Sequence, residues 1–232
     1  MRMEISSDLP ISSNSSRFRF HFHRQWEALF FLAVEIFLGL QVLFLHSDLP
    51  VNNNSHHLLR VYINFTSLML NIGGYFVFPL VVLVFLSLAK RIPLAAARKI
   101  GDFLGGYYAL RMITLLLGLN ILVFDVQSSR FLLITQLLFF LPYSLLVWGW
   151  VYWRLDGISR ARGKPLFKLD HDPVRPAVID YFVASFSTVF SASISVIKGT
   201  SPGSRILILL HGFMIYDIMV LILSRAVAMI QR

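Results

Sequence analysis

Four ionisable side chains interrupt long apolar stretches of this sequence: Glu35, Arg111, His211 and Asp217. A charge in lipid is costly, so such groups usually face the interior of a helix bundle and pair with one another. At 1.5 Å per helical residue, Glu35 and Arg111 lie about 12 Å and about 10 Å in from the same side. The matching depths predict a Glu35–Arg111 ion pair, with Asp217 nearer the middle of the membrane. Such a pair either orients helices or belongs to a proton or ion pathway.

Small polar side chains are concentrated in the stretch 177–197, AVIDYFVASFSTVFSASISVI. Ala184, Thr188, Ser191 and Ser195 recur at helical spacing and therefore share one helix face. Small residues let two helices approach closely, and hydroxyl groups can bond across the contact. The alternative is a polar path through the protein, and its lining would be Thr188, Ser191, Ala192, Ser193, Ile194 and Ser195. The sequence leaves both interpretations open.

The composition indicates which kind of structure must position these groups. Of the 232 residues, 56% are apolar and 14% are charged, and the mean hydropathy is +0.69. A soluble domain has about 25% charged residues, so this balance excludes an ordinary soluble domain and also a disordered chain. We therefore expect a membrane protein. The net charge of +9 is then explained by basic loops beside membrane segments, and no nucleic-acid partner is expected.

Motifs for catalysis and metal binding are missing from the sequence. There is no cysteine, which excludes disulfides and thiolate metal sites. There is no nucleophile elbow, phosphate-binding loop, zinc-binding helix or paired-carboxylate motif, so we expect neither an enzyme nor a cofactor. The nearest approaches to metal-ligand pairs are His56-His57 and His171-Asp172, which we interpret as solvated loop residues.

Hydropathy predicts an all-α bundle of six membrane segments, because each run is long enough to cross about 30 Å of hydrocarbon. The runs are 27–46, 61–89, 104–124, 131–153, 177–197 and 205–229. The chain then divides into a polar cytoplasmic tail (1–26), a four-helix region (27–153), a basic loop (154–176) and a C-terminal hairpin (177–232). An aromatic belt at the membrane surface is predicted from Trp148, Trp150, Tyr152 and Trp153. A close helix contact is indicated by Gly101, Gly105 and Gly106.

The basic residues give this bundle an orientation. If all six runs cross, the N-terminal tail, loops 90–103 and 154–176 and the C-terminus share one side, which holds 16 of the 21 Lys and Arg residues. The positive-inside rule then puts both termini in the cytoplasm, in a plasma or bacterial inner membrane. If 177–197 is instead re-entrant from the cytoplasm, the charge asymmetry survives but the C-terminus lies outside. The full crossing is the simpler arrangement, and we favour it.

Residues 180–188, DYFVASFST, resemble the pore helix of bacterial potassium channels, which often reads D-Y-x-x-x-S-F-x-T. In the same register, the selectivity filter T-V-G-Y-G of that family falls on Ser191, Ala192, Ser193, Ile194 and Ser195. The S-P-x-x-R that often opens the next helix of the family falls on Ser201, Pro202 and Arg205. The resemblance implies a pore-type hairpin over residues 180–225.

The filter positions depart from the potassium-channel pattern, because serine replaces both glycines. Those glycines adopt left-handed backbone angles, which cost other residues about 1–2 kcal/mol each. The resemblance therefore implies a weakly selective or non-conducting pore. The hairpin is also similar to that of an uncharacterised family of bacterial inner-membrane proteins, which has no known activity. That similarity rests on Ser195, Thr200-Ser201 and Leu209-Leu210-His211.

Two functional hypotheses follow. The first is a channel-like protein with a cation and the lipid bilayer as partners, and it would be a homo-oligomer because one hairpin cannot enclose a pore. Thr188 and residues 191–195 would line its path, with Glu35 and Asp217 as polar supports. The second is a structural or accessory membrane protein that conducts no ions.

Overall fold

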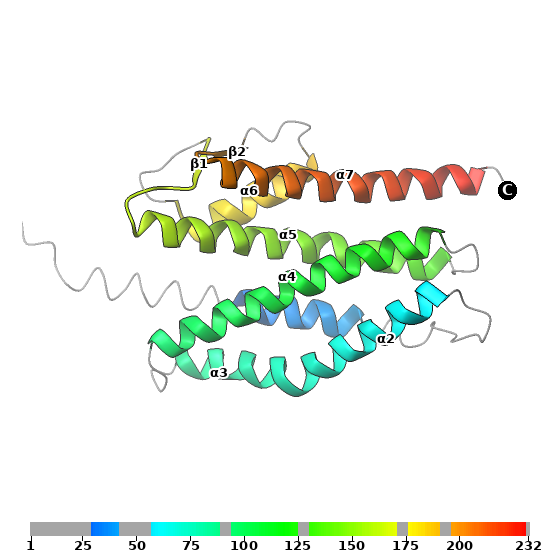
Figure 1. The fold of residues 1–232 in the computed structure, drawn as a ribbon, viewed down its shortest axis with the longest axis horizontal. Coiled ribbons are helices and arrows are strands. Elements are labelled where there is room, and N and C mark those ends of the chain that lie inside the picture. The colour runs from blue at the N-terminus through cyan, green and yellow to red at the C-terminus, as the bar shows by residue number, and fades with distance from the viewer. Residues whose placement is uncertain are drawn as a thin grey trace, which may run out of the picture.

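The computed structural model describes residues 29–41, 57–88, 94–124, 130–170, 176–190 and 196–230. These residues form long helices that lie side by side, with two very short strands at one end of the bundle (Figure 1). The prediction of an all-α fold is confirmed.

One shorter helix and four long elements form the bundle. The helix Leu29–Gln41 comes first, followed by a continuous rod made of α2 (His57–Ile72), the π-helical turn η1 (Gly73–Val77) and α3 (Phe78–Leu88). The other long elements are the helices α4 (Leu94–Phe124), α5 (Arg130–Arg160) and α7 (Pro202–Ile230). The rod, α4, α5 and α7 each contain a stretch long and apolar enough to cross a membrane. Six membrane segments are therefore not confirmed, whereas a multi-helix membrane protein is supported.

The fifth predicted segment, 177–197, does not cross the bundle. It begins with α6 (Val178–Phe190), whose 13 residues extend about 20 Å, less than the 30 Å of a hydrocarbon core. Beyond α6, the strand β2 (Ile197–Gly199) pairs antiparallel with β1 (Phe167–Leu169), which directly follows α5. The chain thus enters and leaves at the same end of the bundle (Figure 1). Our preference for a full crossing is wrong.

The return of this segment changes where the last helix ends. Helix 29–41 runs antiparallel to α5, because the ring of Phe30 lies 6.1 Å from that of Trp150 and the ring of Phe37 lies 6.4 Å from that of Phe139. It therefore begins at the end of the bundle where α5 ends and where α7 begins. Since α7 then runs the length of the bundle, helix 29–41 starts and α7 finishes at opposite ends. The two chain ends themselves lie outside the described residues, so the location of both termini on one side stays a prediction.

The aromatic residues near the end of α5 pack inside the bundle. Trp148 and Trp150 are 8% and 7% exposed, Tyr152 is fully buried, and Trp153 is half-buried. The ring of Trp150 stacks on Phe30 and lies over Gly105 of α4, where a Cβ atom would come within 1.9 Å of it. The predicted aromatic belt is therefore wrong, because α5 continues to Arg160 and these residues contact neighbouring helices. The predicted close contact at Gly105 is confirmed.

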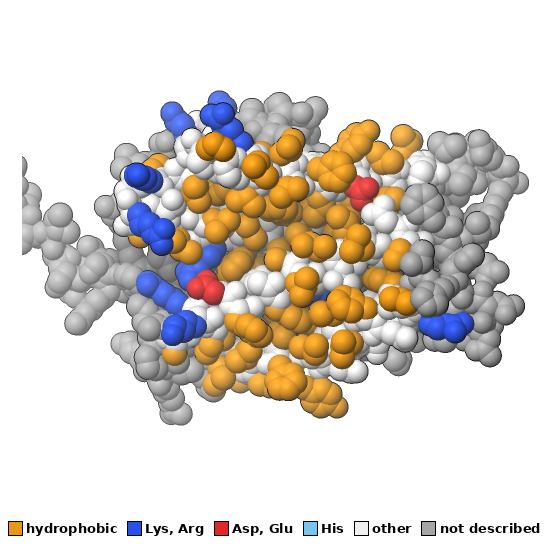
Figure 2. All heavy atoms as spheres, in the orientation of Figure 1, with side chains coloured by type: hydrophobic (Ala, Val, Ile, Leu, Met, Phe, Trp, Pro, Cys, Tyr) orange, Lys and Arg blue, Asp and Glu red, His pale blue; other side chains and the backbone are white. Residues whose placement is uncertain are grey.

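The surface is divided into an apolar middle and a basic end (Figure 2). Apolar side chains cover the middle of the bundle in the view of Figure 2. The large apolar side chains that are exposed include Phe65, Phe76, Ile113, Leu138, Leu209 and Phe213. Most of the Lys and Arg side chains visible in Figure 2 lie at the end where α4 begins and α5 ends. We call this the basic end. An apolar band with charge gathered at its edge is the surface expected of a membrane protein.

Candidate functional site

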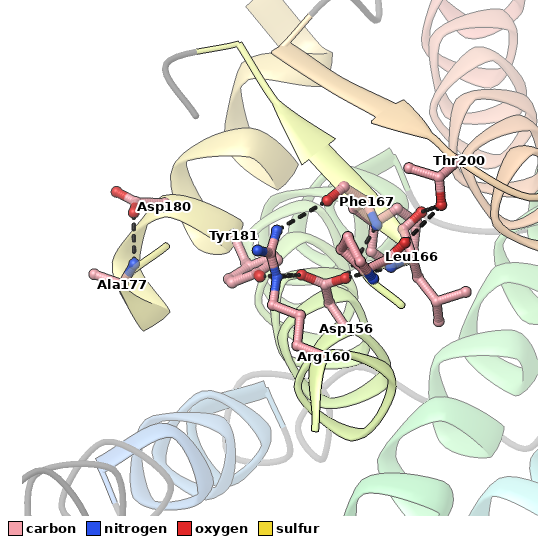
Figure 3. Close-up of polar contacts among 9 residues, drawn as sticks. Asp156, Arg160, Leu166, Phe167, Ala177, Asp180, Tyr181 and Thr200 are labelled. Carbon is pink, nitrogen blue, oxygen red and sulfur yellow. Dashed lines mark hydrogen bonds and ion pairs between the residues drawn. The ribbon is translucent and has the colours of Figure 1, made fainter. Parts of the chain in front are cut away.

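Asp156, on the last turns of α5, holds the re-entrant hairpin together, and its side chain is fully buried. Its Oδ1 accepts hydrogen bonds from the backbone N–H groups of Leu166 and Phe167, at 2.7 and 3.0 Å. Its Oδ2 accepts a bond from the Tyr181 hydroxyl and one of 2.5 Å from Arg160 Nε. Figure 3 shows these groups converging on one carboxylate from α5, α6 and the start of β1. One buried charge therefore links three parts of the hairpin.

The donors around Asp156 are themselves fixed. Arg160 Nη2 donates to the carbonyl of Phe167 at 3.0 Å, so the guanidinium bridges the carboxylate and the strand (Figure 3). Burial raises the pKa of the Tyr181 hydroxyl, and the neighbouring Asp156 raises it further, so Tyr181 stays protonated and donates. Asp156 was not among the residues predicted from the sequence, although an acidic residue four positions before Arg160 is the favourable order for a helical ion pair.

Helix α6 starts with a cap at the basic end and descends along α5. Its Asp180 Oδ2 accepts the N–H of Ala177 at 2.7 Å, and its charge complements the helix dipole. Further along, the Phe182 ring packs on Gly149, where a Cβ atom would come within 2.5 Å. Ser185 Oγ then donates to the carbonyl of Leu145 at 2.8 Å. Leu145 lies 15 residues before the end of α5 at Arg160, so α6 contacts α5 about 22 Å from the end of α5.

The predicted pore-lining residues are only partly within the described structure. Ala184 is fully buried, which agrees with its predicted role in a small-residue packing face. Thr188 is half-buried, and its Oγ1 donates to the carbonyl of Ser185 at 2.6 Å. The remaining predicted lining residues, Ser191, Ala192, Ser193, Ile194 and Ser195, lie outside the described residues.

Helix α7 begins with a capping arrangement that accounts for the S-P-x-x-R residues. The N–H of Ser201 donates to Ser204 Oγ at 3.0 Å, and the N–H of Ser204 donates to Ser201 Oγ at 3.2 Å. Pro202 occupies the first helical position, where its missing N–H is not needed. Arg205 Nε donates to the carbonyl of Gly199 at 3.3 Å, which ties the helix to β2. These contacts fix where the chain leaves the hairpin.

His211 is the side chain at which α5, α6 and α7 meet. It is fully buried, and its ring stacks on Trp148 with the ring centres 4.8 Å apart. Its Nδ1 is 2.9 Å from the Tyr152 hydroxyl, and its Nε2 is 3.5 Å from Thr188 Oγ1. The sequence identified His211 as an ionisable residue in an apolar run, but it did not predict these partners.

The predicted ion pair between Glu35 and Arg111 does not form. Glu35 Oε1 accepts a hydrogen bond of 2.5 Å from Tyr108, whereas Arg111 Nη1 donates to Tyr107 Oη at 3.5 Å. The two charges lie at similar depths, as predicted, because they contact the adjacent residues Tyr108 and Tyr107 of α4. Adjacent residues of a helix point in different directions, about 100° apart, so the two charges are held on different faces of α4. Tyr107 donates onward to the carbonyl of Met69 at 2.9 Å, just before the π-helical turn.

Asp217 is separate from the other charges. Its Oδ2 accepts a hydrogen bond of 2.8 Å from Asn120 Nδ2, which joins α7 to α4 near the end opposite the basic end. Within the described residues, no group of three His, Cys, Asp or Glu side chains could hold a metal ion. The intramembrane charges therefore stabilise separate helix contacts and do not form a single cluster.

The comparisons with known proteins leave the fold and the hairpin to be interpreted from their own geometry. The chain matches no protein-family model, no curated protein and no solved structure.

Proposed function

We propose that this chain is a multi-pass membrane protein whose α5–α6–α7 unit is a channel-type re-entrant element of weak ion selectivity. The observation that supports this proposal is the return of the chain to the basic end after α6, fixed by the β1–β2 pairing and by Asp156. A short helix that enters a bundle part-way and precedes a long apolar helix is the arrangement implied by the potassium-channel resemblance of residues 180–205. The serines in the filter register argue against potassium selectivity.

The physical chemistry of a helix that ends inside a membrane favours a polar path. The last carbonyl groups of a helix lack intrahelical partners and carry partial negative charge, which attracts cations. Irregular backbone at membrane depth is tolerated only where protein buries it or water lines it. Because one hairpin cannot enclose a pore, the proposal requires several copies of the chain around a common path.

The same proposal includes an orientation, with the basic end in the cytoplasm. The count on that side remains 16 of 21 Lys and Arg residues, because Lys198 and Arg205 replace the two arginines of the C-terminal end. This asymmetry follows the positive-inside rule. The hairpin would then be entered from the cytoplasm, and α7 would end on the outer side.

Cysteine labelling tests this orientation, and the absence of native cysteine makes the test clean. We expect Ser159→Cys, at the end of α5, and Gly203→Cys, at the start of α7, to react with a membrane-impermeant thiol reagent only after permeabilisation. Arg60→Cys, at the start of α2, should react in intact cells. Opposite sidedness for positions 159 and 203 would mean that 177–197 crosses the membrane, and it would refute the re-entrant arrangement.

A structural protein that conducts no ions is the second candidate. It is favoured by the described contacts of α6, which are those of a packed helix: Tyr181, Ala184 and Ser185 are buried against neighbouring helices. In that case the hydroxyl groups would bond across helix contacts, and the hairpin would serve only to stabilise the bundle.

Flux measurements distinguish the two candidates. In liposomes containing the purified protein, we expect a cation flux that Ser193→Phe reduces by about tenfold or more, because an aromatic ring would obstruct the path. The matched control is Leu138→Phe, an exposed apolar position on α5 that should leave the flux unchanged. If wild-type protein carries no flux above empty liposomes, the structural candidate is correct. Equal reduction by both variants would refute the path through Ser193.

A further inference from the structure

A groove of about 620 Å³ lies between the helix 29–41, α5 and α6. Its walls include Leu29 and Ala33 from the first helix, Leu146 from α5, and Ile179, Phe182 and Ser187 from α6. Its volume is in the range of pockets that enclose small ligands. None of the contacts that hold the hairpin to β1 and β2 lies in this groove, so it is separate from the Asp156 site.

The walls of the groove select a hydrocarbon occupant. Ser187 is the one lining residue with a polar side chain, and its Oγ donates to the carbonyl of Ala184 at 2.8 Å. All the other lining residues are apolar, with Phe30, Val183 and Phe186 completing the set. Such a surface gains free energy by excluding water and offers a ligand almost nothing to hydrogen-bond.

The length and direction of the groove match one leaflet of a bilayer. The α6 wall extends from Ile179, in the first turn at the basic end, to Ser187, a rise of about 12 Å. Half of a 30 Å hydrocarbon core is about 15 Å. The groove therefore starts at the basic end and ends near the middle of the bundle, as an acyl chain does within its leaflet.

The end of the bundle at which the groove starts also carries exposed positive charges. Tyr181, between the groove residues Ile179 and Phe182, bonds to Asp156, which in turn holds the first residues of β1. The loop and strand on this end expose Arg162, Lys164 and Lys168, and none of the three has an acidic partner in the described part of the chain. Exposed cations at a membrane surface attract anionic lipids.

We infer that the groove holds one acyl chain of an anionic phospholipid from the leaflet at the basic end, with its headgroup beside Arg162, Lys164 and Lys168. The lipid would pack against Phe182 and Phe186 and support α6 where it faces the helix 29–41. This binding site does not depend on ion conduction, because a non-conducting hairpin would need the same support.

Native mass spectrometry of the purified, delipidated protein tests this site, with phosphatidylglycerol and phosphatidylcholine as probes. We expect wild-type protein to retain one phosphatidylglycerol per protomer in preference to phosphatidylcholine. Ala33→Trp should reduce retention by about tenfold by filling the groove, whereas Leu138→Trp, on exposed α5 surface outside the groove, should not. Replacing Arg162, Lys164 and Lys168 together with glutamine should abolish the preference for phosphatidylglycerol and leave the binding of phosphatidylcholine unchanged.

Val183→Trp provides a second test, because Val183 lines the groove but is more than half exposed and tolerates a larger side chain. Its thermal unfolding midpoint should stay close to that of the wild type while lipid retention falls. Equal retention by the wild type and by folded groove variants would overturn the proposal. So would the absence of any retained lipid, or equal retention of the two lipids by wild-type protein.

Discussion

Replacing Asp156 with alanine is expected to release the re-entrant hairpin and to lower the free energy of unfolding by about 3–5 kcal/mol. The substitution removes the acceptor of two backbone N–H groups, the Tyr181 hydroxyl and the Arg160 guanidinium. All four donors lose this acceptor, and a guanidinium left without its counter-ion in a half-buried position is particularly costly. The loss should appear as a lower unfolding midpoint in detergent and as faster proteolysis between α5 and α7.

Asp102→Ala is the matched control for this prediction. Asp102 accepts two bonds from Arg154, at 2.6 and 2.8 Å, so the geometry of the ion pair is at least as good as at Asp156. The Asp102 side chain, however, is 50% exposed, and an exposed ion pair contributes only about 0–1 kcal/mol. Equal destabilisation by the two alanine variants would show that burial and the backbone bonds of Asp156 do not matter, and our account of the hairpin would then be wrong.

Asparagine at position 156 separates the roles of shape and charge. Its amide oxygen can still accept the N–H groups of Leu166 and Phe167, whereas its NH₂ group would face the donors Tyr181 and Arg160. We therefore expect an intermediate loss of stability for Asp156→Asn. A loss as large as that of Asp156→Ala would indicate that the bonds to Tyr181 and Arg160 carry most of the effect.

The all-α class and most of the helices could be predicted from the sequence, because both depend on local hydropathy. The path of 177–197 could not be predicted in this way. Its residues are apolar enough to cross or to return, and hydropathy gives the same result for both. The decisive contact is the β1–β2 pairing, in which three residues on each side meet across about 30 positions of intervening chain. No local signal in such short strands distinguishes them from loop.

The sequence predicted a residue of the candidate site only where the type of that residue, such as a glycine or an intramembrane charge, was enough to indicate its role. The group of small residues Gly101, Gly105 and Gly106 predicts a close helix contact, and among them Gly105 lies against the Trp150 ring. Arg111 is buried and Glu35 is half-buried, but their partners depend on which way Tyr107 and Tyr108 point. Asp156 was overlooked because it lies among the basic residues that follow the fourth span, where a carboxylate looks like an ordinary loop residue.

Replacing Gly105 with alanine is expected to lower the free energy of unfolding by about 3 kcal/mol, at the upper end of the usual overpacking cost. The added Cβ atom would lie 1.9 Å from Cη2 of the Trp150 ring. That ring is 7% exposed and stacks on Phe30, so it cannot rotate into free space. Helices α4 and α5 would have to separate, which would disturb the surface on which helix 29–41 packs.

The adjacent glycine provides the control for this last prediction. Gly106 has nothing within 4 Å of its Cβ position, so Gly106→Ala should leave stability unchanged or raise it by up to about 1 kcal/mol through helix propensity. The double variant Gly105→Ala/Trp150→Phe should lose less free energy of unfolding than the summed losses of its two single variants. The reason is that phenylalanine removes the part of the ring that the methyl group meets. The unfolding midpoints of the wild type, the three single variants and the double variant are measured by thermal unfolding in detergent. Equal midpoints for Gly105→Ala and Gly106→Ala would contradict the close approach of α4 and α5, whereas a large difference between neighbouring glycines can only come from what each one faces.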